Sequence, residues 1–149
     1  MTGSASGGPA PQNVLAAVGL FGDLDSGALQ RLERLGRRRR FGPGEVIMRQ
    51  GDGGIALFAV LGGRVRVSRR GADGQEQALR TIGPGGYFGE MALLSNRPRS
   101  ATVAASPEGE VECLVLHRLD FLEEVRRQPE LAVRLLETLS RRLEDAERR

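Results

Sequence analysis

The residues from Gly83 to Ala105, GPGGYFGEMALLSNRPRSATVAA, hold the side-chain types that can bind a small phosphate-bearing molecule. Gly89 stands directly before a carboxylate, Glu90, and a short apolar, helix-like piece follows. Arg99 and Ser100 then precede an expected strand. An arginine presents a permanently charged, planar fork that matches phosphate oxygens, and a serine hydroxyl adds a further donor.

The backbone around Gly89 can supply the rest of an anion site. The first turn of a helical piece has unpaired N–H groups and a partial positive charge, and a glycine lets a ligand approach the main chain closely. Glu90 is out of place beside an anion unless it accepts hydrogen bonds from a neutral group, such as a ribose hydroxyl. An anion cradle with a hydroxyl acceptor therefore indicates a compact ribose phosphate.

The segment GYFGEMALLSNRPRSATV resembles the phosphate-binding cassette of the cyclic nucleotide-binding domain family. This family includes catabolite-activator-type regulators of bacteria, regulatory subunits of protein kinase A and nucleotide-gated channels. A second segment, FGPGEVIMRQGDGGIALFAVLGGRVRV, is similar to the opening strands of the same family. The resemblance covers roughly residues 20–149.

The resemblance implies a β-roll of about eight antiparallel strands with flanking helices, which binds cyclic AMP or cyclic GMP without hydrolysing it. It assigns Glu90 to the ribose 2′-hydroxyl, and Arg99 and Ser100 to the cyclic phosphate. It assigns the backbone part of the site to Gly89 and to the amides of Met91, Ala92 and Ala101. We expect the side chains of residues 91–94 to lie in the core. No metal, cofactor or catalytic residue is expected.

Turn signals divide the middle of the chain into short strands. They recur about every 8 to 12 residues from Pro43-Gly44 to Gly85-Gly86, a spacing typical of sandwiches, barrels and rolls. Short runs rich in β-forming residues lie between them, as in Ala56 to Leu61. We therefore expect a β-roll over about 37–117. The uncharged, Gly/Ser/Pro-rich residues 1–12 read as a disordered tail, and residues 13–149 as one domain.

Helices are expected before and after the roll along the chain. Asp25 or Ser26 can cap a short helix that ends at Gly36. Two helices should fill about 120–149, the first capped by Asp120 with Glu123, and the second with Pro129 in its first turn.

The last helix has two apolar stripes. One has the spacing of a coiled-coil seam and predicts a homodimer. The other could pack on the β body, and the alternative is that both form one broad core face. The seam consists of Ala132, Leu136, Leu139, Leu143 and Ala146, and the second stripe of Leu131 and Leu135.

The base-binding end of the pocket is less well defined. In catabolite-activator-type members, hydroxyl side chains of the long helix contact the base, but the matching residues here are Ala146 and Glu147. An aliphatic lid or a guanidinium of Arg141 or Arg142 remains. Ser100 does not decide between adenine and guanine as the base of the ligand. We favour cyclic AMP because it is the commoner ligand.

Composition and charge exclude several other classes. All 22 basic residues are arginine, which does not titrate below about pH 12, so the net charge of +3 is a better guide than the pI of about 10.3. Arg37–Arg40 fall on an expected strand without interleaved aromatic residues, which favours a solvated strand over nucleic-acid binding. One cysteine and one histidine exclude a disulfide framework, an iron–sulfur cluster and a cupin-type metal enzyme. Cys113 and His117 are expected to be structural.

The chain is expected to be cytoplasmic. Its longest uncharged apolar-rich stretch, Gly53 to Gly63, is about half of a membrane span, and the first basic residue, Arg31, comes too late for a signal peptide. We expect no direct DNA binding, since no helix-turn-helix follows the long helix. The chain is a free-standing sensor or part of a larger regulator. A ligand-blind dimerisation module with the same fold is the alternative function.

Overall fold

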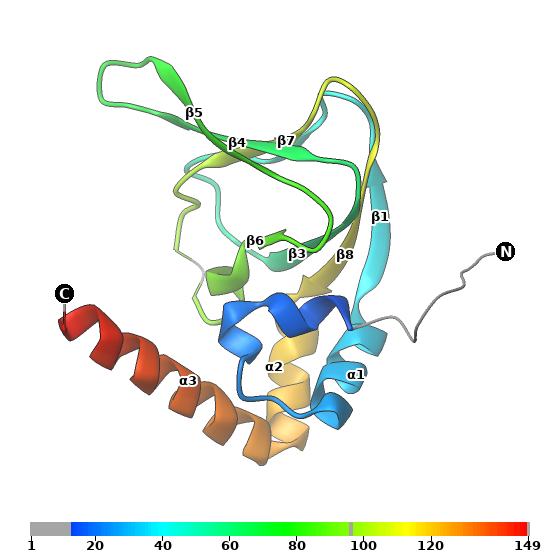
Figure 1. Ribbon diagram of the computed structural model, residues 1–149, viewed down its shortest axis with the longest axis vertical. Helices are drawn as coiled ribbons and strands as arrows, with labels where there is room; N and C mark the ends of the chain where they lie inside the picture. The colour runs from blue at the N-terminus through cyan, green and yellow to red at the C-terminus, as the bar shows by residue number, and fades with distance from the viewer. Residues whose placement is uncertain (1–12, 96, 149) are drawn as a thin grey trace, which may run out of the picture.

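The computed structural model describes residues 13–95 and 97–148, so the expected disordered tail at residues 1–12 lies outside the described residues. Eight antiparallel strands form two four-stranded sheets that face each other, with the helices gathered at one end (Figure 1). The strand orders are β1-β8-β3-β6 and β2-β7-β4-β5. The predicted β-roll with flanking helices is confirmed.

The elements have the following bounds. The strands are β1 (Arg37–Phe41), β2 (Val46–Met48), β3 (Ala56–Gly62), β4 (Val65–Arg70), β5 (Glu76–Ile82), β6 (Tyr87–Phe88), β7 (Thr102–Ala105) and β8 (Val111–His117). The α-helices are α1 (Ser26–Leu35), α2 (Arg118–Arg127) and α3 (Pro129–Glu147), and the 3₁₀ turns are η1 (Val14–Ala17), η2 (Gly19–Phe21) and η3 (Glu90–Leu93).

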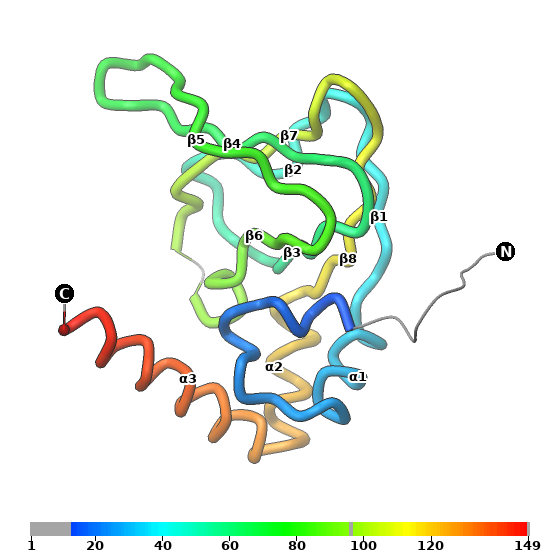
Figure 2. The backbone as a smooth tube through the Cα atoms, viewed as in Figure 1, coloured from blue at the N-terminus to red at the C-terminus, as the bar shows by residue number. Residues whose placement is uncertain are grey.

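A first apolar core fills the space between the two sheets. The β4 strand shows why, because Val65 and Val67 are buried while Arg66 between them is exposed, the period-two pattern of a half-buried strand. Phe58 and Phe88 stack at the centre, with ring centroids 4.9 Å apart. Cys113 is also buried here, as expected. The long β4–β5 hairpin extends beyond this core (Figure 2).

A second core attaches the helices to the outer face of the β3–β8 pair. Leu57 on β3 and Leu116 on β8 point into it, opposite to the side chains that enter the first core. Phe21 of η2 and Phe121 of α2 stack there with ring centroids 6.0 Å apart. Because β3 is buried on both faces, the N-terminal turns and the C-terminal helices rest on one shared layer of side chains.

The two stripes of α3 differ in burial. Leu131 and Leu135 are buried in the second core, whereas Leu136 and Leu143 are 64% and 63% exposed. The alternative of one broad core face is wrong for Leu136 and Leu143, whereas Leu139 of the seam does pack against the second core. None of the helices in the described part of the chain is long and apolar enough to span a membrane.

Helix starts were predicted with mixed success. The Asp25 carboxylate accepts a hydrogen bond from the Ala28 amide at 2.8 Å and caps α1, as expected. The predicted cap of the next helix, Asp120 with Glu123, is wrong: α2 begins at Arg118, directly after β8, and no side chain caps it. The Arg118 amide instead donates to the carbonyl of Ile55, the residue before β3, at 2.8 Å, so a backbone contact satisfies one amide of this helix end.

The arginine run on β1 lies on the surface. All four arginines are exposed, Arg38 and Arg40 lie 3.8 and 3.9 Å from Glu112, and the Arg39 guanidinium stands 5.0 Å from the centre of the Phe41 ring. This is the solvated strand that the sequence predicted. Positive side chains on an edge strand also hinder pairing with another chain.

The second core generates a stability prediction. Phe121→Ala should lower the free energy of unfolding by about 3 to 5 kcal/mol, because a fully buried ring is removed and a cavity remains. Leu119→Ala on the same helix is the control: that side chain is 79% exposed, so its loss should cost no more than about 0.5 kcal/mol. Urea denaturation measures both. Equal costs would show that α2 does not dock as described.

Candidate functional site

The turn after β6 brings the backbone against the half-buried Arg99. Gly89 has a φ of +81°, and a Cβ there would lie 2.7 Å from both the Ala56 carbonyl oxygen and Nη1 of Arg99. Only glycine meets both requirements, the left-handed conformation and the missing side chain. The η3 turn begins directly afterwards at Glu90.

Arg99 is held in place without a carboxylate partner. Its Nη2 donates to the Ala56 carbonyl oxygen at 3.0 Å, and its Nε is buried with no hydrogen-bond partner among the described residues. A Cβ on Gly54 would lie 3.0 Å from Nε, so a second glycine makes room for the guanidinium. Burial lowers the pKa of Arg99 from its ordinary value, although an arginine stays charged in proteins. A half-buried cation that has no paired carboxylate is stabilised by a bound anion.

Glu90 links the turn to the helices. One carboxylate oxygen, Oε2, accepts a hydrogen bond from the Leu20 amide at 2.7 Å, and the other, Oε1, lies 3.3 Å from Nη2 of Arg142 on α3. The side chain is only 11% exposed. Beside it, the Tyr87 hydroxyl accepts from the Gly19 amide at 3.2 Å. The carboxylate that the sequence assigned to a ribose is therefore engaged with the η2 turn and with α3.

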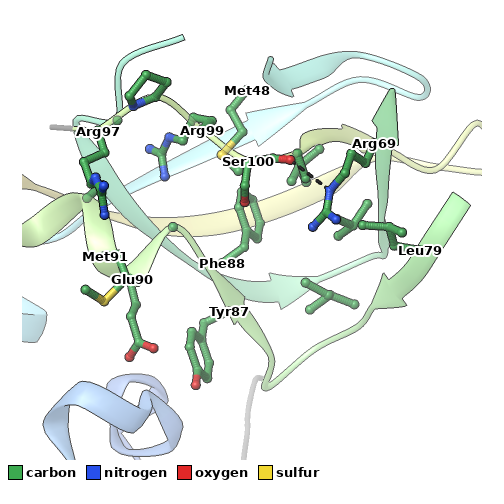
Figure 3. A pocket seen from close by; sticks show the side chains of 18 of the residues that line it. Met48, Arg69, Leu79, Tyr87, Phe88, Glu90, Met91, Arg97, Arg99 and Ser100 are labelled. Atoms are coloured by element: carbon green, nitrogen blue, oxygen red, sulfur yellow. Dashed lines mark hydrogen bonds between the residues drawn. The ribbon is translucent and has the colours of Figure 1, made fainter. Parts of the chain in front are cut away.

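The predicted site residues surround one cavity of about 700 Å³, which opens between η3, the start of β7 and the β4–β5 pair (Figure 3). It is lined by all seven of them: Gly89, Glu90, Met91, Ala92, Arg99, Ser100 and Ala101. Their roles in binding stay predictions. The expectation that residues 91–94 lie in the core holds for Ala92 and Leu93, but it is wrong for Met91, which is 53% exposed and faces the cavity.

The β4–β5 pair contributes lining residues that the sequence analysis missed. The register pairs Val67 with Arg80 and Ser68 with Ala78, so Leu79 has no partner and forms a β-bulge. Both Leu79 and Arg80 line the cavity. The alternation along β4 was the signal that would have placed Arg69 on the same inner face.

The cavity carries an excess of positive charge. Four guanidinium groups line it, those of Arg69, Arg80, Arg97 and Arg99, and none lies within ion-pair distance of a carboxylate in the described part of the chain. Among the described residues, Glu90 is the only carboxylate in the lining, and Arg142 already pairs with it. The arrangement suits an anionic ligand.

The described residues offer neither a metal cluster nor a reactive thiol. No cluster of three or more histidine, cysteine, aspartate or glutamate side chains that could hold a metal ion occurs within residues 13–95 and 97–148. Burial, and to a lesser extent the Glu112 carboxylate, raises the pKa of the Cys113 thiol to about 12. That thiol is therefore a poor nucleophile at neutral pH.

Comparisons with known proteins agree with this geometry. The family model of the cyclic nucleotide-binding domain matches residues 38–128. The cyclic AMP receptor protein of Thermus thermophilus is 43% identical over 111 residues, which cover 74% of this chain and 50% of that protein. Human cGMP-dependent protein kinase 2 is 35% identical over 122 residues, covering 80% of this chain and 16% of the kinase. The chain thus spans half or less of these relatives.

A solved structure has the same fold over nearly its whole length. It is the N-terminal domain of a transcriptional regulator from Streptomyces coelicolor, with a TM-score of 0.83 and 31% identity, covering 92% of this chain and 94% of that one. Together with the family match across the roll and the cavity, this shows that the chain belongs to the cyclic nucleotide-binding domain family.

Proposed function

We propose that this chain is a sensor that binds cyclic AMP in the cavity and does not turn it over. The proposal rests on the half-buried guanidinium of Arg99, whose Nε is buried without a partner, which has no carboxylate partner among the described residues and which shares its cavity with Glu90. A cyclic phosphate supplies the missing anion, and its ribose supplies a hydroxyl within the same compact molecule. The name of the Thermus relative, a cyclic AMP receptor protein, supports this choice.

Cyclic GMP is a second candidate because of Arg80. Arg80 lies on the same face of β5 as the buried Ile82 and lines the cavity, and an arginine can bind O6 and N7 of guanine through two parallel hydrogen bonds. One relative is named as a cGMP-dependent kinase. The ratio of the two dissociation constants separates the candidates. We expect cyclic AMP to bind more tightly.

Binding would be coupled to the helices through Glu90. A ribose hydroxyl at this carboxylate competes with the Leu20 amide and with Arg142, the two groups that engage it now. Leu93 of the η3 turn is fully buried in the second core with Phe121 of α2, which gives a further route for the shift. The ligand changes the helix arrangement only by the difference in its affinity for the two arrangements.

A separate contact ties α3 to the N-terminal segment. Asp23 Oδ2 lies 2.6 Å from Nη2 of Arg141 and accepts a hydrogen bond from the Thr138 hydroxyl. The Arg141 guanidinium, followed by the Thr138 hydroxyl, holds the pKa of Asp23 below its ordinary value. Besides the buried Leu131 and Leu135, α3 therefore has two polar attachments, at Asp23 and at Glu90, and only the second borders the cavity. In this proposal the ligand acts on one point and leaves the other as a pivot.

The output is proposed to be a homodimer formed through the exposed stripe of α3. Leu136 and Leu143 are large apolar side chains that are mostly exposed. Their spacing along the helix is that of a coiled-coil seam. A direct DNA contact by Arg37–Arg40 is not part of the proposal, since Glu112 and Phe41 already engage three of them. A cytoplasmic location is proposed from the single buried, unpaired cysteine.

Arg99→Gln tests the binding proposal. Cyclic AMP at about a hundred times its dissociation constant should stabilise the wild-type chain by about 2.7 kcal/mol, and the variant should lose this stabilisation because the phosphate loses its buried counter-ion. Thermal unfolding with and without each cyclic nucleotide, followed by calorimetry, measures it. Arg66→Gln on the outer face of β4 is the matched control and should respond like the wild type.

Two results would contradict this account in different ways. Wild-type protein that neither nucleotide stabilises would favour the ligand-blind dimerisation module. Undiminished stabilisation of Arg99→Gln would show that the phosphate lies elsewhere in the cavity.

Leu143→Glu tests the dimer. The side chain is 63% exposed and does not belong to the second core, unlike Leu139, so a charge there should leave the monomer folded. Sedimentation velocity should show a dimer for the wild type and a monomer for the variant, because the glutamate places a charge in the seam. A wild-type protein of monomeric mass at micromolar concentration would refute the proposal.

A further inference from the structure

Arg69 enters the cavity from β4, which pairs with β7, the strand that follows Arg99. On β4 the buried Val65 and Val67 face inward, and Arg69 continues the same face at the rim of the roll. Figure 3 shows its guanidinium turned toward Ser100, beside the residues assigned to the phosphate. Two arginines, one half-buried and one exposed, therefore flank Ser100.

One hydrogen bond orients the guanidinium of Arg69 and leaves its other N–H groups free of protein partners among the described residues. Its Nε donates to the Ser100 carbonyl oxygen at 3.2 Å, which fixes the plane of the group. An arginine has five N–H donors, and the two terminal nitrogens of Arg69 make no hydrogen bond to any residue in the described part of the chain. The contact with Ser100 therefore leaves the outer edge of the fork available to a ligand.

The charges around Arg69 favour an anion at this place. No described carboxylate pairs with it, and Arg80 lies one diagonal step away on the inner face of β5. Like charges on one face of a sheet destabilise each other. A phosphate bound between Arg69 and Arg99 would offset the repulsion between the guanidinium groups of Arg69 and Arg80. A neutral base at the same place would not.

We infer that Arg69 is a second phosphate-binding residue, so that two guanidinium groups hold the cyclic phosphate, Arg99 from the buried side and Arg69 from the solvent side. The inference rests on the proposed function and adds a residue to its site. The purely structural alternative is that Arg69 only anchors the Ser100 carbonyl. The two differ in one respect, which is whether the ligand phosphate senses the guanidinium directly.

Calorimetry with cyclic AMP on Arg69→Gln tests the inference. The dissociation constant should rise about tenfold at low ionic strength, the loss expected for one hydrogen bond to a charged group. The loss should shrink at high ionic strength, because salt screens an exposed charge more strongly than a buried one. Arg66→Gln, on the opposite face of the same strand, should bind as the wild type does.

The phosphorus NMR resonance of bound cyclic AMP gives the second readout. In Arg69→Gln, it should move relative to its position in the wild-type complex. An unchanged dissociation constant, or a salt-independent loss with an unmoved resonance, would overturn the inference in favour of the anchoring role. Equal melting temperatures of the ligand-free proteins establish that the variant folds. Failure of the wild type to bind cyclic AMP would instead overturn the proposed function, so the two failures are distinguishable.

Discussion

The site depends on the half-buried guanidinium of Arg99, which no carboxylate of the described residues neutralises. Arg99 donates to one backbone carbonyl, and its Nε has no partner among the described residues. The surroundings are shaped to keep it there, since a Cβ at Gly54 or Gly89 would collide with it. Burying a charge in this way costs free energy that an apolar side chain would not. The cost is explained if an anion occupies the cavity during part of the protein's life.

Glu90 connects the surroundings of Arg99 to the N-terminal turns and the C-terminal helix. It lies next to the glycine that touches Arg99, yet its carboxylate reaches the η2 turn and α3. A ligand that engages both the cation and the carboxylate therefore acts on two segments far from the cavity in sequence. The buried Leu93 adds a packing contact between the same turn and α2. No chain of intermediate residues is needed to carry the shift, because the η3 turn contacts η2, α2 and α3 directly.

The sequence predicts those parts of the site that are local. Gly89, Glu90, Arg99 and Ser100 lie within one short segment, and turn signals with period-two runs indicate the roll around it. The contacts of Glu90 were not predictable, because Leu20 and Arg142 lie 70 and 52 positions away and only tertiary packing brings them together. The place of Leu79 in the lining depends on the β-bulge, which leaves no pattern in the sequence. The start of α2 was wrong because β8 runs directly into the helix and a backbone contact replaces the cap.

Hydrogen exchange at the contacts of Glu90 tests whether ligand binding in the cavity reaches η2 and α3 through this carboxylate. The account predicts that saturating cyclic AMP changes exchange over η2, including the Leu20 amide, and over the part of α3 around Arg142, as well as in the cavity strands. In Glu90→Gln the ligand should still alter exchange near Arg99 but leave η2 and α3 unchanged. Protection confined to the cavity strands in the wild type would contradict the account.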